Sequence, residues 1–182
     1  TGSLPSGLQT LTFGYWFNQY IPTLPSGLQT LIWNSKYALT GSLPSGLQTL
    51  TFGRYFNQDI PTLPSGLQTL TFVNSNGYLL INELPLNLQS LNVGSKQYTL
   101  EEFRTEMNKK LTFTCPGNTN IGNLEYIFPN LQTLTFGDEF NQDIPTLPSG
   151  LQTVIWNSQY ALTGSLPSGL QTLTFGKSFN KD

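Results

Sequence analysis

The sequence contains no histidine, one cysteine and one methionine among its 182 residues. Without histidine it lacks the commonest general base and the commonest metal ligand of proteins, and a single cysteine cannot form an internal disulfide. Paired carboxylates occur only between neighbours in the sequence, as in Glu101 and Glu102. We therefore expect no catalytic residues, no metal site and no cofactor.

Charged residues are also scarce, at 10% of the chain against about a quarter in an average soluble domain. Eight basic and ten acidic residues leave a net charge of -2, which is too small to hold a phosphate backbone or an anionic membrane. No apolar run approaches the roughly 18 residues of a membrane span. The sequence predicts no nucleic-acid partner and no membrane span.

The cellular location stays undetermined from these residues. No signal-peptide pattern is present, and no Asn-x-Ser/Thr glycosylation signal occurs despite many asparagines. Together with the single cysteine, these features favour a cytoplasmic location.

The chain does contain a repeat of about 20 residues. The string LPSGLQTLTFG occurs at Leu4, Leu43 and Leu166. With the first Leu of LQTL as position 1, nine repeats follow one another at steps of 19 to 23 residues. They begin at Leu8, Leu28, Leu47, Leu67, Leu88, Asn108, Leu131, Leu151 and Leu170. A unit this short cannot bury its own apolar face, so it must stack on its neighbours.

Positions 1, 4 and 6 of a repeat are apolar, as in Leu8, Leu11 and Phe13. This is the spacing of a leucine-rich-repeat strand, and positions 4 and 6 share one buried face. The preceding Leu-Pro-Ser-Gly supplies turn residues. We predict a mainly β fold, namely a leucine-rich-repeat-like parallel β solenoid of about nine turns of 19–23 residues. We expect one solenoid over 1–182, with regular repeats at 1–87 and 131–182 and irregular repeats at 88–130.

The irregular part contains a charged segment, Tyr98 to Lys110, which holds six of the 18 charged residues. Thr99 stands three residues before Glu102 as in a capping box, and Leu100, Phe103 and Met107 form an apolar stripe. We predict one short surface helix in the middle of the chain. Either it only replaces a return loop, or it is a secondary docking site. The docking candidates are Glu101, Glu102, Arg104 and Glu106.

The single cysteine, Cys115, falls at position 8 of the sixth repeat in this frame, just after the strand. We expect a small, half-buried packing residue, because no cationic neighbour in the sequence favours a reactive thiolate.

From Thr51 to Phe72 the chain reads TFGRYFNQDIPTLPSGLQTLTF. This segment resembles the FNIP repeat, a leucine-rich-repeat relative abundant in social amoebae and also found in giant viruses. Phe56, Asn57, Ile60 and Pro61 stand at the places of the family motif. The resemblance runs through Leu8 to Leu67 and again from Leu131 to Asp182. It implies a parallel-strand solenoid with a binding or scaffold role and supplies no catalytic residues.

Positions 2, 3 and 5 of each repeat point outward, so that stacking draws columns of Gln and Thr along one face of about nine strands. In the sixth repeat this frame places Lys109, Lys110 and Thr112 in the columns. The predicted binding face consists of Gln9, Thr10, Thr12, Gln29, Thr30, Gln48, Thr49, Thr51, Gln68, Thr69, Thr71, Gln132, Thr133, Thr135, Gln152, Thr153, Gln171, Thr172 and Thr174.

Three interpretations of this face stay open. It is a plain soluble sheet surface, a broad interaction surface for a protein or a glycan, or an ice-binding surface built on the Thr-x-Thr ladder. We predict that the chain is a non-catalytic repeat solenoid that acts as a protein-interaction or structural scaffold through this face.

The two ends of the chain suggest a further alternative. The final 13 residues from Leu170 and the first 7 residues together make one repeat, and no polar capping repeat stands at either end. We expect either an excerpt of a longer array or a subunit that self-associates head to tail into a filament.

Overall fold

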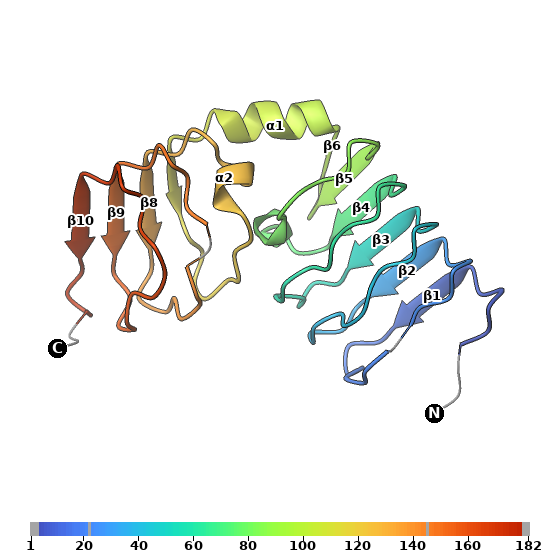
Figure 1. Ribbon diagram of the computed structural model, residues 1–182. Helices are drawn as coiled ribbons and strands as arrows, with labels where there is room; N and C mark the ends of the chain where they lie inside the picture. The colour runs from blue at the N-terminus through green and yellow to red at the C-terminus, as the bar shows by residue number, and fades with distance from the viewer. Residues whose placement is uncertain (1–3, 22, 145, 180–182) are drawn as a thin grey trace. The chain divides into compact units, whose positions relative to one another are not determined.

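The computed structural model describes residues 4–21, 23–144 and 146–179. The chain separates into two compact units, an N-terminal unit of Thr1–Glu102 and a C-terminal unit of Phe103–Asp182. Each unit stacks short strands that are joined by irregular return segments (Figure 1). The single solenoid over 1–182 stays a prediction, and residues 1–3 and 180–182, which the end-joining prediction uses, lie outside the described residues.

The N-terminal unit holds a six-stranded sheet in the order β1-β2-β3-β4-β5-β6, and the C-terminal unit holds a four-stranded sheet in the order β10-β9-β8-β7. The parallel strands of the N-terminal unit pair in register, so that Leu11, Leu31, Leu50, Leu70 and Leu91 lie side by side. The parallel strands are β1 (Thr10–Phe13), β2 (Thr30–Trp33), β3 (Thr49–Phe52), β4 (Thr69–Phe72), β5 (Ser90–Val93), β7 (Thr112–Thr114), β8 (Thr133–Phe136), β9 (Thr153–Trp156) and β10 (Thr172–Phe175).

The strands β1 to β4, β9 and β10 each begin after a tight turn at Leu-Pro-Ser-Gly. The amide of Leu28 donates to the carbonyl of Pro25 at 3.1 Å, and the same bond recurs in the other repeats that carry this motif. Proline fixes φ and has no N–H to lose, which suits it to open this turn. The amides of Gln29 and Thr30 then both donate to the Gln9 carbonyl at 2.9 Å, which joins one repeat to the next.

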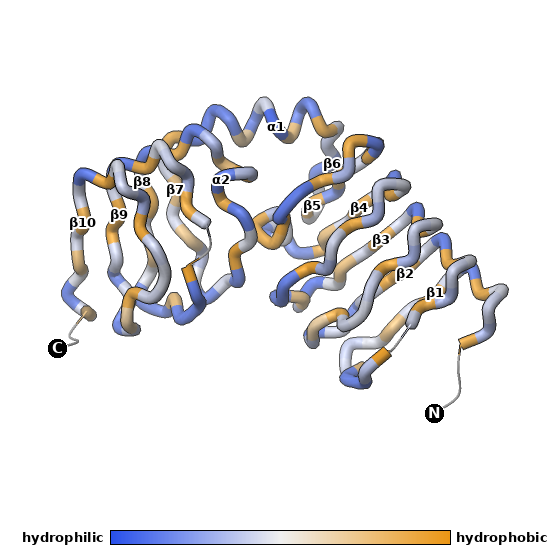
Figure 2. The backbone as a smooth tube through the Cα atoms, viewed as in Figure 1, coloured by the Kyte–Doolittle hydropathy of each residue, from blue (hydrophilic) through white to orange (hydrophobic). Residues whose placement is uncertain are grey.

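The core lies behind the strands, where positions 1, 4 and 6 of the inner regular repeats are buried. Leu50 and Leu134 are 0% exposed, and the rings of Phe52 and Phe72 stack with centroids 5.4 Å apart. Positions 3 and 5 of the same strands are half-buried on the other face. Figure 2 shows this alternation of apolar and more polar positions along the strands. The predicted parallel, repeat-laddered β fold is confirmed.

One strand departs from the all-parallel prediction. β6 (Lys96–Tyr98) pairs antiparallel with β5 through a two-residue turn at Gly94 and Ser95. Gly94 has φ +60°, a conformation that short hairpin turns need and that glycine adopts without strain. The parallel ladder of the N-terminal unit therefore ends at β5.

The predicted surface helix is α1 (Leu100–Asn108), and its capping box is present. The amide and hydroxyl of Thr99 donate to the Glu102 carboxylate at 2.8 and 2.9 Å, and the Glu102 amide donates to the Thr99 hydroxyl at 3.3 Å. Phe103 and Met107 are buried, as the apolar stripe predicts. The described residues also contain two four-residue helices that were not predicted, η1 (Gly77–Leu80) and α2 (Leu124–Ile127).

The predicted frame of the sixth repeat is wrong by two residues. β7 pairs Thr112 with Thr133 and Phe113 with Leu134, so Phe113 takes position 4 and Cys115 takes position 6. The reason is that α1 extends through Asn108, so the chain reaches the strand two residues later. Cys115 is consequently buried, at 2% exposure, where other repeats place Phe, Trp or Val.

The longest helix in the described ranges, α1, has nine residues, and none of the helices there has the length and apolar character needed to cross a membrane.

Candidate interaction surface

The glutamines at position 2 are the most exposed part of the predicted face. Their backbone carbonyls hold the ladder together, as in the bonds from Gln48 and Thr49 amides to the Gln29 carbonyl at 2.9 Å. Their side chains are exposed, and none of them is hydrogen bonded to another described residue. The column is therefore a row of free amide donors and acceptors at the spacing of parallel strands, about 4.8 Å. Its members are Gln9, Gln29, Gln48, Gln68, Gln89, Gln132, Gln152 and Gln171.

The threonine columns lie beside it on the strands themselves. In the sheet of the N-terminal unit, Thr30, Thr49 and Thr69 pair in one column, and Thr51 and Thr71 pair in the next. These side chains are half-buried in the middle strands and exposed on β10. Ile32 and Ile155 interrupt the position 5 column.

The structure brings the predicted face together as two ladders, not as one continuous nine-strand lattice. In the N-terminal unit the columns run from β1 to β5, and in the C-terminal unit from β7 to β10. Lys109 and Lys110 are not members of the columns, because the two-residue shift of the frame puts Leu111 at position 2 and Thr112 at position 3. Thr112 belongs to position 3 instead of position 5.

Behind the face, two buried serines anchor the alternate repeats, and sequence analysis overlooked them. The Ser35 hydroxyl donates to the Phe17 carbonyl at 2.7 Å and accepts from the Tyr37 amide at 3.0 Å. Trp33 Nε1 donates to the Tyr37 carbonyl at 2.9 Å. Ser158, Trp156 and Tyr160 repeat the arrangement. The recurring string Trp-Asn-Ser-x-Tyr was the available signal.

The docking candidates on α1 stay predictions. Glu101 and Arg104 are exposed, and Glu106 is half-buried. Glu102 is exposed but holds the helix cap: the hydrogen bonds from the Thr99 amide and then from its hydroxyl lower the pKa of the Glu102 carboxyl, with a smaller contribution from Lys96. Its carboxylate is therefore already committed to the fold.

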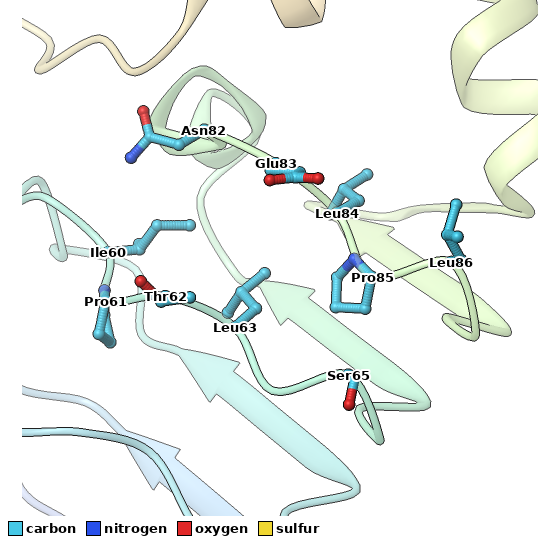
Figure 3. Close-up of a pocket in the computed structure, with 10 residues that line it drawn as sticks. All are labelled: Ile60, Pro61, Thr62, Leu63, Ser65, Asn82, Glu83, Leu84, Pro85 and Leu86. Atoms are coloured by element: carbon cyan, nitrogen blue, oxygen red, sulfur yellow. The ribbon is translucent and has the colours of Figure 1, made fainter. Parts of the chain in front are cut away.

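A hollow of about 330 Å³ opens between two successive return segments of the N-terminal unit (Figure 3). One wall is the segment from Ile60 to Leu63, and the other is the segment from Asn82 to Leu86. Leu86 is 83% exposed, and Glu83 is the only charged residue of the lining. The hollow is open, its lining mixes polar and apolar side chains, and it brings together no set of groups for catalysis.

Cys115 does not provide reactive chemistry. Burial raises the pKa of its thiol to about 12, so that it stays protonated at neutral pH. In the ranges that the structure describes, no cluster of three or more acidic or cysteine side chains is placed to hold a metal ion.

A second exposed surface was not predicted from the sequence. Trp16 and Tyr55, in the turns that follow β1 and β3, are 72% and 63% exposed. Lys36 lies over the rings of Tyr15 and Trp16, with its Nζ 5.5 and 4.5 Å from their centroids. These residues lie about 20 residues apart in the sequence and meet only when repeats stack, so no single motif reveals them.

Comparison with known proteins agrees with the repeat pattern. Residues 33–75 match the model of the family described as FNIP Repeat, which confirms the resemblance for this segment. A solved structure described as "The crystal structure of CroV588 a novel circular LRR protein structure" is 29% identical, with a TM-score of 0.40. The match covers 97% of this chain and 28% of that one. No curated protein matches the sequence.

Proposed function

We propose that this FNIP and leucine-rich-repeat-like chain is a non-catalytic scaffold that binds a protein partner across its Gln and Thr columns. The observation that carries the proposal is the column of exposed glutamine side chains without a partner in the described residues. An amide that is already solvated and pre-positioned can exchange water for a partner's backbone or side-chain groups. In-register strands place these amides on a rigid frame.

The proposal is tested with charged substitutions on the face. Thr49→Arg combined with Thr69→Arg places two cations in the middle of the N-terminal ladder, where both threonines are half-buried. We expect loss of partner capture from an extract of the cells that make the protein, because the charges must be desolvated on binding.

A matched control is Thr23→Arg with Thr40→Arg, two exposed threonines in return segments. Both double variants should unfold at the wild-type denaturant concentration. If the Thr49 and Thr69 variant stays folded and captures the same proteins as the control, the proposed face is wrong.

Ice binding is a second candidate, favoured by the in-register threonine pairs such as Thr49 with Thr69. Ile32 and Ile155 are evidence against ice binding, because they interrupt the position 5 column of threonines. Thermal hysteresis of the purified chain distinguishes the two functions: a freezing point equal to that of a matched albumin solution eliminates ice binding.

The filament alternative predicts that a second copy stacks on the last strand, β10. Leu173 and Phe175 are 38% and 46% exposed there, whereas the matching Val154 and Trp156 of β9 are buried. Fibres seen by electron microscopy would support it, and their absence at high concentration would eliminate it.

A further inference from the structure

Repeats 1, 3 and 7 differ from one another at a few outward positions after the strand and agree at the others. From position 6 onward they read FGYWFNQYIPT in repeat 1, FGRYFNQDIPT in repeat 3 and FGDEFNQDIPT in repeat 7. All differences fall at positions 8, 9 and 13, and positions 8 and 9 form the turn that follows the strand. Packing does not require these differences, since the buried positions are the same in all three.

In the N-terminal unit these turns form one surface, which we call the aromatic–cationic row. The Tyr15 ring contacts the ring of Trp16 at 4.6 Å and that of Tyr55 at 5.2 Å between centroids. Lys36 lies over the rings of Tyr15 and Trp16. The row consists of Tyr15, Trp16, Lys36, Arg54 and Tyr55.

The row joins the turns of three successive repeats. Tyr15, at position 8 of repeat 1, meets Tyr55, at position 9 of repeat 3, across repeat 2. In repeat 2, position 8 is Ser35, which is 0% exposed and bonded to the Phe17 carbonyl, and position 9 is Lys36, which the repeat adds to the row. The Lys36 cation stabilises the placement of the Tyr15 and Trp16 rings through cation–π attraction.

The composition of the row is that of a binding surface. Tryptophan, tyrosine and arginine are the residues that most often dominate protein interfaces. Arg54 and Tyr55 extend the row into a hollow of about 420 Å³ that Val73, itself 47% exposed, also lines. The row contains no carboxylate.

The complementary surface is present on the same chain. In repeat 7 of the C-terminal unit, positions 8 and 9 are Asp138 and Glu139, which we call the acidic turn. Both side chains are exposed. With only 18 charged residues in the chain, this concentration of one sign on the matching turn stands out against a neutral surface.

We propose that the partner of the aromatic–cationic row is a second copy of this chain, bound through its acidic turn. Carboxylates of the acidic turn would pair with Lys36 and Arg54, while the exposed rings of Trp16 and Tyr55 would lose contact with water. Opposite charges on two otherwise weakly charged surfaces set the orientation of such a contact. This interaction goes beyond the proposed scaffold function, because it uses the turns and not the Gln and Thr columns.

The test is sedimentation velocity of the whole chain over a range of concentrations at low and at high salt. We expect self-association that weakens as salt rises, because salt screens exposed charges. Lys36→Glu with Arg54→Glu should raise the dissociation constant about tenfold or more, and Asp138→Lys with Glu139→Lys should do the same. The variant that combines all four changes should recover self-association, because the charges are again complementary.

The matched control is Lys109→Glu with Lys110→Glu, which changes the net charge by the same amount at two exposed lysines. It should associate like the wild type, as should the Thr49 and Thr69 variant of the proposed binding face. Circular dichroism confirms that each variant is folded. Trp16→Ala with Tyr55→Ala should also weaken association, and without a change in charge.

A wild-type chain that stays monomeric at the highest attainable concentration overturns the proposal. The proposal is also overturned if the variant with all four charge changes is folded but does not recover self-association. A monomeric chain whose aromatic–cationic row binds heparin or a polyglutamate peptide overturns it as well. Fibres that are insensitive to all of these charge changes would likewise place self-association elsewhere.

Discussion

Single residues behind the strands decide how well the alternate repeats pack. Ser35 and Ser158 are both 0% exposed, and each hydroxyl satisfies a backbone carbonyl and a backbone amide of the return segments. A serine here is needed for its small size and its two hydrogen bonds together.

Removing either hydroxyl should therefore be costly. We expect Ser35→Ala and Ser158→Ala each to lower the free energy of unfolding by about 1–3 kcal/mol, because buried polar groups lose their partners. Chemical denaturation measures the effect. The exposed Ser26→Ala should change stability by less than about 0.5 kcal/mol, and a cost for Ser35→Ala no greater than that would contradict the role assigned to these serines.

The buried thiol makes a prediction about pH. Burial raises the pKa of Cys115 to about 12, whereas an unfolded cysteine titrates near about 8.5. Between these values the unfolded chain has lost a proton that the folded chain retains, so stability should fall as pH rises through this window. Iodoacetamide should modify the native thiol far more slowly than the thiol in denaturant, and equal rates would show that Cys115 is accessible.

At the scale of elements, the repeat pattern predicted the strands well and predicted their interruption poorly. Positions 4 and 6 had to face inward because no other stripe of the repeat is apolar, and the capping box of Thr99 and Glu102 marked the start of α1. The end of α1 was harder to place. Asn108, Lys109 and Lys110 fit either a last helical turn or the start of a strand, and only the packing of Phe113 and Cys115 decides between them.

The hairpin of β5 and β6 had a local signal that the repeat frame obscured. Gly94 and Ser95 stand between two short runs of strand residues, a pattern typical of a two-residue hairpin turn. The frame instead extended the parallel ladder through this point.

Gly94 offers a direct test of that hairpin. Its φ of +60° is strained for any residue with a Cβ, and an added Cβ would also approach Ser75 to 3.3 Å. We expect Gly94→Ala to cost about 1–2 kcal/mol in unfolding free energy. Gly150→Ala, where a Cβ meets no atom within 4 Å, is the control; equal effects of the two changes would mean that Gly94 does not adopt this conformation.

At the scale of the whole molecule, a layered stack makes the cost of a core substitution depend on whether neighbours cover it on both sides. Leu50 and Leu173 occupy the same repeat position, yet they are 0% and 38% exposed. We expect Leu50→Ala to cost about 2–5 kcal/mol and Leu173→Ala less than half as much. Similar losses for both, measured by denaturant unfolding, would be inconsistent with stacked repeats.

The function was less predictable from the sequence than the fold. The Gln and Thr columns could be written down from the repeat alone, because every repeat contributes the same residue at the same place. The aromatic–cationic row could not, since its members come from different repeats and differ in type. Tyr15 and Tyr55 stand at different repeat positions, 8 and 9, and meet across an intervening repeat, which the sequence pattern does not show.

The most direct test of the scaffold proposal is site-specific photocrosslinking in the cells that make the protein. A photoreactive residue at Gln48 lies on the exposed glutamine column, and one at Ser45 lies three residues earlier in the exposed turn. The account predicts a crosslinked protein partner from Gln48 that is absent from Ser45. Crosslinks of equal yield at both positions, or at Ser45 alone, would contradict it.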